Sequence, residues 1–555
     1  MANIYARLQD AAQSLCDVRE RCGAPSVSVG ILHEGRVIFT YSSGFRDVEK
    51  QLPATSDTIY FLGSISKTWV SAAAGILVGE GHMNWNDKIQ HHLPEFNPVG
   101  DPEIGKNADL VDVLRHSSGL ANPVIQLLGP GGMLMLREED FMNFVNLGPT
   151  ENEKGQRYNR EWSYSSMGYG VMAKVIERVS GMSFSSFIRE RILRPLKMDR
   201  TVVSRSGYVN DNNLAYPYAM REDGSFVRIR SDEWTSEEAT SVLAAFGIRS
   251  SVNDMLKWAA AILAAEKAGT LGQDDQKSEG NPLREMTTIR RAYWTRPTDD
   301  EYQNESAFCM GWFRGVMPSA QVGWGSFNSR TKFNKEKSYL NFIMGRDSPK
   351  RLFIKHHGIL EASAAVITTF PETQSAVISM TNGLNRGDAA DWAAQIMIQS
   401  LFNLQPTINF KPLIDLEAKL RYADYNDTVL VPWLEHRNVG EPEKNRQEFL
   451  GKYEGWAMTL EIIIGDMGSL KLIFNGRDDM PVNLDYYNKD QYTFLPASRD
   501  EWVAGGYLDF DNYMMFVLDF KRDDSSKING LWWMWDDGYK STWFEKKGGS
   551  LQTGR

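Results

Sequence analysis

Residues 60–67 read Tyr-Phe-Leu-Gly-Ser-Ile-Ser-Lys and lead directly into an alanine-rich, apolar segment that ends near Gly79. This segment has no charged side chain after Lys67, which predicts a buried helix from Thr68 to about Gly79. Ser64 and Lys67 are three residues apart, so on a helix the amine can reach the hydroxyl. A serine hydroxyl must give its proton to a base before it can attack a carbonyl group. The spacing therefore indicates Ser64 as a candidate nucleophile and Lys67 as its candidate base.

Two properties of this position favour a reactive serine. Burial disfavours the charged form of a lysine, so a buried Lys67 can be neutral and accept a proton from Ser64. Ser64 is also expected at the N-terminus of the helix, where free backbone N–H groups and the helix dipole stabilise negative charge. The spacing alone equally fits a serine that caps the helix beside a lysine that extends to solvent.

The same spacing occurs a second time, at Ser329 and Lys332. That copy lies in a polar stretch, residues 326–337, with no apolar helix behind it. It is therefore interpreted as exposed surface, and the Ser64 copy as the functional one.

Two later segments supply further side chains that a serine enzyme could use. Residues Glu161–Gly170, which include Tyr164 and Ser166, open a second helical run that stops at Gly181. Residues Leu352–Gly358 form a short apolar strand that ends in two histidines and a glycine, and two more strand-like runs follow it.

The three segments together resemble the motifs of the serine β-lactamase and penicillin-binding-protein superfamily, in particular its class C-like esterases, D-peptidases and acyltransferases. That family combines S-x-x-K, Y-x-N or a relative of it, and K-T-G or H-x-G. The matching segments here are Ser64–Lys67, Tyr164–Ser166 and His356–Gly358. Two further segments agree: Leu93–Phe96 resembles the family's LPEF element, and Leu114–Leu120 resembles its LLxHTSGL segment.

The resemblance implies an α+β fold for residues 1–405, in which an antiparallel sheet flanked by helices is combined with an all-helical subdomain. It implies that Ser64 forms an acyl-enzyme, and that Lys67 and the phenol or phenolate of Tyr164, close to two cations, transfer the proton. The backbone N–H groups of Ser64 and Ile359 would form the oxyanion hole. In such sites the loss of one donor typically costs about 10²-fold or more in rate.

Departures from the family pattern narrow the expected activity. Ser166 stands where β-lactamases have an asparagine, although a serine can still hydrogen-bond Lys67. His356 and His357 replace the lysine and threonine of K-T-G, which removes the pair that usually holds a β-lactam carboxylate. Antibiotic hydrolysis is therefore not the expected activity, and Ser166, His356, His357 and Gly358 are predicted to bind another substrate. Strand alternation allows only one of the two histidines to face the cleft, and His356 is the expected one.

The activity that these features favour is hydrolysis of a small-molecule ester or amide through an acyl-enzyme. The same chemistry would serve an acyltransferase or thioester-releasing enzyme of a biosynthetic pathway, or a D-amino-acid-specific peptidase. A third class is a catalytically inactive protein that uses the fold to bind a ligand. The presence of Ser64, Lys67 and Tyr164 together argues against this third class.

Composition limits the expected partners. The 555 residues, 42% of them hydrophobic, are enough for two or more globular domains. A net charge of −10 argues against nucleic acid or an anionic membrane as partner, so a small-molecule substrate is expected, and a homo-oligomer is left open. The first residues lack an apolar signal region and no long apolar run follows, which predicts a cytoplasmic protein. The 3 cysteines and 8 histidines show no metal-ligand spacing, so neither a metal nor another cofactor is expected.

Sequence patterns outside the motifs predict the rest of the first domain. An amphipathic helix, Ile4–Arg21, precedes an expected hairpin that turns at Glu34–Gly35. The hairpin would join the strand Leu352–Gly358 and the two strands after it in one antiparallel sheet. A helix from Ala389 to Leu404 would cover this sheet.

Residues 265–306 interrupt this pattern with a charged stretch that contains glycine and proline. They are predicted to form a surface insertion or lid. Within it Trp294 and Tyr302 are candidate substrate contacts, and a disordered surface loop is the alternative.

The last part of the chain differs from the first in composition and in its pattern of apolar residues. Residues 406–440 contain prolines and polar residues and are predicted to be a linker. Between residues 441 and 549, short aromatic and β-branched runs alternate with turn residues, which predicts a small β-barrel. The segment GKYEGW at Gly451–Trp456 resembles the lipocalin-like modules that occur at the carboxy terminus of some family members. Residues 550–555 are predicted to be a tail.

Overall fold

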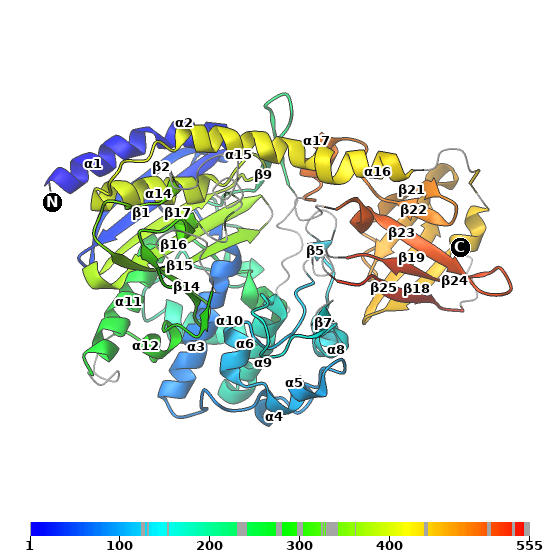
Figure 1. The fold of residues 1–555 in the computed structure, drawn as a ribbon, viewed down its shortest axis with the longest axis horizontal. Coiled ribbons are helices and arrows are strands. Elements are labelled where there is room, and N and C mark those ends of the chain that lie inside the picture. The colour runs from blue at the N-terminus through cyan, green and yellow to red at the C-terminus, as the bar shows by residue number, and fades with distance from the viewer. Residues whose placement is uncertain are drawn as a thin grey trace.

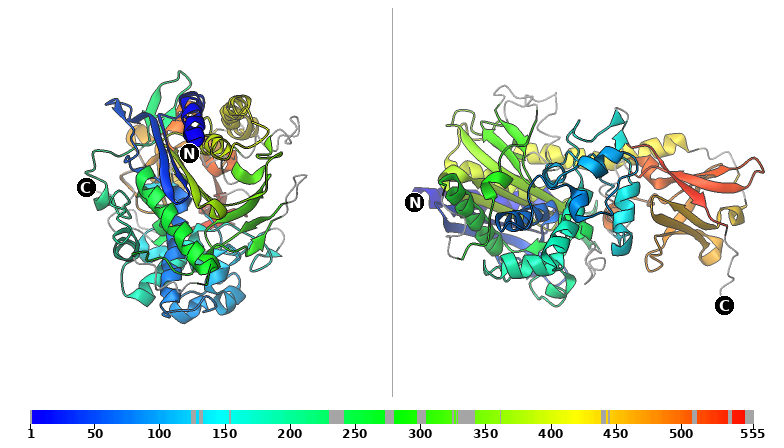
Figure 2. Two further views of the ribbon diagram at one scale, coloured as in Figure 1. Left: turned by 90° about the vertical axis from the view of Figure 1, so that its left-hand side faces the viewer. Right: turned by 90° about the horizontal axis from the view of Figure 1, so that it is seen from below.

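The computed structural model describes residues 2–123, 128–129, 133–152, 155–229, 241–272, 280–296, 304–323, 326, 328, 342–360, 362–437, 442–443, 445–507, 512–535 and 539–548. These residues form an α+β body built on one large antiparallel sheet, followed by a closed β-barrel (Figure 1). The N-terminus and the barrel lie at opposite ends of an elongated molecule (Figure 2). The α+β fold with a carboxy-terminal barrel, expected from the sequence, is confirmed.

The main sheet has nine strands within the described residues. In spatial order they are β12 (Trp294–Thr295), β13 (Ser306–Phe308), β14 (Phe313–Met317), β15 (Arg351–Leu360), β16 (Ser363–Phe370), β17 (Ser375–Thr381), β1 (Ser26–His33), β2 (Arg36–Asp47) and β3 (Leu52–Pro53). All pairs are antiparallel, and β1 lies beside β17, which joins the beginning of the chain to the later strands. The predicted hairpin turn is confirmed, since Glu34 and Gly35 adopt the left-handed conformation, with φ of 51° and 73°.

Each face of this sheet carries its own apolar core. Along the central strands Ile367 and Ile378 belong to one core, whereas their neighbours Val366 and Val377 belong to the other, as the alternation of strand side chains requires. One face is covered by α1 (Ala2–Gln13), α2 (Leu15–Arg21) and α14 (Ala389–Phe402). These helices correspond to the two predicted from the sequence, the first of them interrupted at Ser14.

Helices also cover the other face of the sheet and extend into a helical subdomain. Next to the sheet is α11 (Val252–Thr270), and α12 (Met286–Ile289) packs against both α11 and α3 (Lys67–Gly79). Around them are α4 (Ile89–His92), α5 (Pro102–Asn107), α6 (Leu110–Leu114), α8 (Phe141–Leu147), α9 (Ser166–Ser180) and α10 (Phe184–Ile188). Trp69 of α3 stacks on Trp258 of α11, with ring centroids 4.6 Å apart. Nowhere in the described part of the chain is a helix both long and apolar enough to cross a membrane.

Short two-stranded ladders connect these helices. They are β4 (Tyr60–Phe61) with β11 (Arg249–Ser250), β5 (Leu128–Gly129) with β6 (Met133–Leu134), β7 (Glu151–Asn152) with β8 (Gly155–Gln156), and β9 (Tyr218–Met220) with β10 (Phe226–Arg228). The β4–β11 ladder matters most for the site, because β4 leads directly into the turn that carries Ser64.

The stretch predicted as an insertion or lid is largely part of the main body. Its first residues continue α11 to Thr270, and α12 packs against α3. Trp294 belongs to the edge strand β12, where it pairs with Phe308. Tyr302 lies outside the described residues. These short helical and strand segments were not predicted, because they are stabilised by tertiary packing and give no pattern of their own in the sequence.

The segment between the body and the barrel, predicted as a linker, is mostly helical. It contains α15 (Lys411–Asp424), a π-helical turn (Tyr425–Leu430) and α16 (Val431–His436), which together bridge the two parts along one side (Figure 1). Pro412 stands in the first turn of α15, where proline is compatible with a helix. The prolines therefore mark the start of a helix.

The barrel closes from eight antiparallel strands. They are β18 (Gly451–Gly455), β19 (Met458–Ile464), β20 (Leu470–Phe474), β21 (Val482–Asn488), β22 (Gln491–Thr493), β23 (Val517–Arg522), β24 (Ile528–Trp533) and β25 (Thr542–Lys546), with α17 (Arg499–Ala504) between β22 and β23. Buried rings pack against one another inside it, among them Phe520 against Tyr453 at 5.4 Å and Phe474 against Trp533 at 5.6 Å. Aromatic residues thus form the core of the barrel.

Candidate active site

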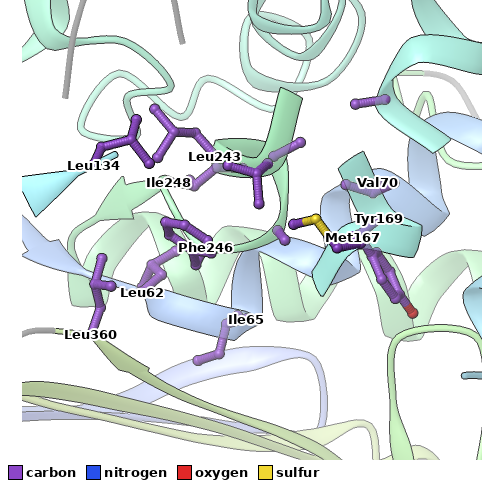
Figure 3. Packing of buried hydrophobic residues seen from close by; sticks show 14 of the residues in the cluster. Leu62, Ile65, Val70, Leu134, Met167, Tyr169, Leu243, Phe246, Ile248 and Leu360 are labelled. Carbon is purple, nitrogen blue, oxygen red and sulfur yellow. The ribbon is translucent and has the colours of Figure 1, made fainter. Parts of the chain in front are cut away.

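Ser64 lies in a tight turn at the entrance of the buried helix. Residues Gly63–Ser66 form one 3₁₀ turn, and α3 continues from Lys67 without a break. The predicted helix is confirmed, and Lys67 is completely buried. Figure 3 shows apolar side chains around this turn, including Ile65, Phe246 and Leu360.

The amine of Lys67 contacts three oxygen atoms. Its Nζ lies 3.0 Å from Ser64 Oγ, 3.3 Å from Ser166 Oγ and 3.1 Å from the backbone carbonyl of Ala245. All three oxygen atoms belong to neutral groups. No negative charge contacts the amine to offset the cost of burying an ammonium ion. Burial therefore lowers the pKa of Lys67 well below its usual value.

Tyr164 completes the group around Ser64. Its hydroxyl is within hydrogen-bond reach of the Ser64 hydroxyl, and its ring centroid lies 4.8 Å from Lys67 Nζ. Desolvation raises the pKa of the phenol above its usual value, and the hydrogen bond with Ser64 opposes this rise only in part. The raised pKa favours the neutral phenol over the phenolate, the two forms that the sequence left open.

The start of α9 holds the second motif in place. Ser165 caps this helix, and its hydroxyl also donates a hydrogen bond to the carbonyl of Ala121, at 2.8 Å. The backbone N–H of Ser166 donates to Asn122 Oδ1, also at 2.8 Å. The helix begins at Ser166 and ends before Gly181, which has φ of 68°, in agreement with the predicted glycine stop.

The backbone of β15 runs directly against the turn that carries Ser64. A Cβ on Gly358 would lie 1.8 Å from the carbonyl oxygen of Leu62 and 2.9 Å from the nitrogen of Ser64. A Cβ on Gly63 would lie 2.6 Å from the nitrogen of Ile359. Only glycine fits at both positions, and the two N–H groups expected to form the oxyanion hole are brought to the same place.

The two histidines of β15 lie on opposite faces of the sheet. His356 is on the face of Lys67, which is close enough to lower its pKa further after the main effect of burial. His357 lies on the other face, where its Nε2 is 2.5 Å from Oδ2 of Asp388, the residue that caps α14. The prediction that His357 binds substrate therefore does not agree with the structure, because a hydrogen bond with Asp388 holds this ring on the far face.

Sequence reasoning missed His116, which supports the site from behind. Its ring lies 4.4 Å from the ring of Tyr164, and its Nδ1 accepts a hydrogen bond of 3.0 Å from the N–H of Ser165. The sequence did contain an indication of His116, since this residue lies inside the segment Leu114–Leu120 that resembles the family's LLxHTSGL motif. The contact of Ala245 with Lys67 had no such signal, because it is made by a backbone carbonyl.

Comparison with known proteins identifies the family and the fold. The family described as Beta-lactamase matches residues 10–400, which is more than half of the chain. This chain belongs to the beta-lactamase family. A penicillin-binding protein homologue from Pyrococcus abyssi, described as octameric, shares the fold over 97% of this chain and 99% of its own, with a TM-score of 0.54 and 19% identity.

Curated relatives of this beta-lactamase family member match only parts of it. Protein flp of Staphylococcus aureus (strain MW2) is 26% identical over 186 residues, or 33% of this chain and 36% of that protein. A beta-lactamase of Yersinia enterocolitica is 24% identical over 255 residues, or 44% of this chain and 56% of that protein. The chain thus spans only about a third to a half of the length of these relatives.

Neither metal-binding clusters nor disulfides occur among the described residues of this family member. No group of three or more His, Cys, Asp or Glu side chains is placed there to hold a metal ion. The three cysteines, Cys16, Cys22 and Cys309, are free.

Proposed function

We propose that this protein is a serine hydrolase that cleaves an ester or amide of a small molecule through an acyl-enzyme on Ser64. The observation that carries the proposal is the 3.0 Å contact between the Lys67 amine and the Ser64 hydroxyl. The same amine is fully buried, and this burial lowers its pKa. A nucleophile and a base of matched protonation state therefore lie within hydrogen-bond distance.

The contacts of Lys67 also orient its lone pair. A neutral amine has two N–H donors and one lone pair. The carbonyl of Ala245 can only accept a hydrogen bond, and the hydroxyl of Ser166 offers a second acceptor. With both N–H groups used in this way, the lone pair is directed to the hydroxyl proton of Ser64.

The reaction then proceeds in two stages. Lys67 accepts the proton of Ser64 as Oγ attacks the substrate carbonyl, and the N–H groups of Ser64 and Ile359 stabilise the oxyanion. The phenol of Tyr164 gives its proton to the leaving group, and the resulting phenolate takes the proton that Lys67 accepted from Ser64. In the second stage water attacks the acyl-enzyme, and the same groups return the proton to Ser64.

The same first stage serves the other candidate activities. An acyltransferase, a thioester-releasing enzyme and a D-amino-acid-specific peptidase differ in the group that leaves and in the group that accepts the acyl chain. Hydrolysis of a simple ester or amide is preferred over hydrolysis of a β-lactam. Ser166 stands in place of the asparagine, and His356 in place of the lysine, that bind a β-lactam in the family. A ligand-binding protein without activity would not require a buried lysine against a serine hydroxyl.

Labelling with a fluorophosphonate tests the proposal, because this reagent reacts with activated serines. We expect mass spectrometry to find Ser64 modified, and Ser64→Ala to abolish labelling. Ser329→Ala removes the other serine with the same spacing to a lysine and serves as the matched control, with labelling unchanged. Modification of Ser329, or no modification at all, would remove the enzyme assignment.

The family neighbour from Pyrococcus abyssi is described as octameric, and we extend assembly to this chain as part of the proposal. We expect a homo-oligomer in solution. Size-exclusion chromatography with light scattering measures the molar mass directly, against 62.9 kDa for one chain. A particle of that mass at micromolar concentration would contradict the assembly.

A further inference from the structure

We propose that the outer face of the barrel binds a neutral carbohydrate, a function separate from the chemistry of Ser64. The site is built on a tryptophan pair, Trp532 of β24 and Trp543 of β25, and on a cavity lined by polar side chains beside it. Its ligand is a short segment of an uncharged glycan chain.

The tryptophan pair belongs to a row of side chains that crosses four strands of the barrel. Gln491 of β22 pairs with Asp519 of β23. Asp519 pairs with Trp532, which in turn pairs with Trp543. Side chains of directly paired residues lie on the same face of a sheet. Leu531, next to Trp532 in β24, is buried in the barrel, whereas Trp532 is 39% exposed, so the row lies on the outer face.

A glycine holds the ring of Trp543 in place. A Cβ on Gly530, within β24, would lie only 2.1 Å from Cζ2 of Trp543. The indole therefore lies directly on the backbone of β24, which explains a glycine at a position where it weakens the strand. The ring of Trp532 is 5.2 Å away between centroids and is inclined by 56°. The tryptophan pair thus forms a bent aromatic surface that the barrel fixes before a ligand binds.

An aromatic surface of this kind suits sugar rings. The face of an indole carries partial negative charge, which attracts the slightly positive C–H groups on one side of a sugar ring. The distance between the two indoles is comparable to the separation of consecutive rings in a glycan chain. Each indole of the tryptophan pair can therefore contact one sugar ring.

A cavity of about 500 Å³ continues the row beyond the rings. Gln491 and Asp519 of the row line it, together with Lys489 and Lys521. Its volume falls within the range of about 300–1,000 Å³ that is usual for small-ligand sites. Amide, carboxylate and ammonium groups supply both hydrogen-bond donors and acceptors, as the hydroxyl groups of a sugar require.

The charges around the cavity favour a neutral ligand over an ionic one. Lys521 Nζ lies 2.7 Å from Asp519 Oδ2, and Arg522 Nη2 lies 2.9 Å from Asp490 Oδ1. All four residues line the cavity. Because these cations and carboxylates neutralise one another, they can still bond hydroxyl groups but do not select a charged partner. An uncharged glycan fits this set better than an acidic one.

The size of the tryptophan pair argues against a second copy of the chain as its occupant. A stable protein interface buries about 800 Å² on each partner. Two tryptophans contribute at most about 500 Å² of surface when they are completely covered. Trp532 is more than half buried before any ligand binds, so its available surface is smaller still. The pair is therefore assigned to a small ligand.

Isothermal titration calorimetry on the full chain tests the inference. The probes are four neutral hexasaccharides, cellohexaose, laminarihexaose, chitohexaose and maltohexaose, and the acidic hexagalacturonate. We expect submillimolar binding of at least one neutral hexasaccharide, and binding of hexagalacturonate that is at least about tenfold weaker. Tenfold corresponds to about 1.4 kcal/mol.

Variants connect the binding to the tryptophan pair. Trp532→Ala should weaken the affinity by about tenfold, the usual effect of one aromatic contact, and Trp532→Tyr should restore most of it. Gly530→Ala keeps both indoles but displaces the ring of Trp543, and should weaken binding to a similar extent. Tyr422→Ala, at an aromatic residue of α15 that is 40% exposed, is the matched control and should bind as the natural protein does.

Three results would overturn the inference. They are no binding of any neutral hexasaccharide at millimolar concentration, unchanged affinity in Trp532→Ala, and tighter binding of hexagalacturonate than of every neutral probe. Light scattering tests the other occupant: if Trp532→Ala dissociates an oligomer of the natural protein and no glycan binds, the tryptophan pair contacts a second copy instead. Labelling of Ser64 is independent of all these measurements, so this inference and the proposed function can each fail alone.

Discussion

Lys67 contacts two hydroxyls and one carbonyl, and none of these groups carries a charge that would hold an ammonium ion. We expect Lys67→Ala to lower kcat by about 10²–10⁴-fold, the usual contribution of a general base, with a much smaller change in KM. Steady-state kinetics on a p-nitrophenyl ester measures both. An unchanged kcat would exclude Lys67 as the base, and Lys174→Ala, at a half-buried lysine of α9, controls for the loss of a lysine elsewhere.

The pH dependence follows from the direction of two pKa shifts. Lys67 acts in its deprotonated form, so kcat/KM should fall as the pH decreases through its lowered pKa and reach a plateau above it. Tyr164 has a raised pKa and should stay protonated across this plateau. A pH profile of kcat/KM tests both expectations. A rate that rises steadily to about pH 10.4, the pKa of an ordinary lysine, would contradict a neutral Lys67.

At the scale of residues, the sequence predicted the parts of the site that are formed by the side chains of recognisable motifs. Ser64, Lys67 and Tyr164 converge as their motifs indicated, because each motif sets the local geometry of a helix start. The carbonyl of Ala245 could not be predicted, since every residue has one and only the folded chain brings this one to Lys67. The hydrogen bond that holds His357 on the far face could not be predicted for the same reason, since its partner Asp388 lies 31 positions away.

At the scale of elements, the segment before α9 positions Tyr164. His116, in the left-handed conformation with φ of 63°, accepts from the Ser165 N–H and packs its ring on Tyr164. We expect His116→Ala to lower both kcat and the melting temperature, because it removes this packing and forces alanine into the left-handed region. His116→Asn should lower kcat by about tenfold with a smaller loss of melting temperature, because asparagine tolerates this conformation but lacks the ring.

Kinetics and thermal unfolding of the two variants separate these effects. If both variants keep the natural kcat, His116 does not position Tyr164. A change confined to KM would assign it to substrate binding instead.

The same scale shows where pattern reading succeeds and where it fails. The strands around His356 were predicted because their apolar runs are continuous, as in strands buried on both faces. The helices of the connection to the barrel were not predicted, because this segment contains prolines and polar residues, although Pro412 stands in the first turn of a helix, where proline is compatible. The strand β12 is too short to give a pattern and is recognised only by its pairing with β13.

At the scale of the molecule, the barrel contacts the helical subdomain that carries Tyr164. Asn475 and Arg477 of the barrel donate to the carbonyls of Met135 and Leu134, at 2.6 and 3.0 Å. Arg157, in the segment that leads to Tyr164, is hydrogen-bonded to Tyr539 of the barrel. The sequence predicted a barrel from its strand spacing, but not these contacts, because they join loops that share no motif.

Trp456 is the central residue of this interface and the subject of the last prediction. Its ring stacks on Phe144 of α8, with centroids 4.7 Å apart, and its Nε1 donates to the Phe144 carbonyl at 2.9 Å. Trp456 has φ of 43° at the hairpin turn, a conformation unfavourable for a bulky residue, and the contact with α8 offsets this cost. Trp456→Ala should therefore lower the melting temperature by several degrees and split unfolding into two transitions.

Differential scanning calorimetry measures this change directly. Trp532→Ala, at a tryptophan of the same barrel that is 39% exposed, is the control and should leave a single transition near the natural temperature. If Trp456→Ala unfolds at the natural temperature in one transition, the stacked pair does not couple the barrel to the body. If it lowers kcat as well, the coupling extends through the segment of Arg157 to Tyr164, and the barrel then supports the geometry of the site as well as the stability of the chain.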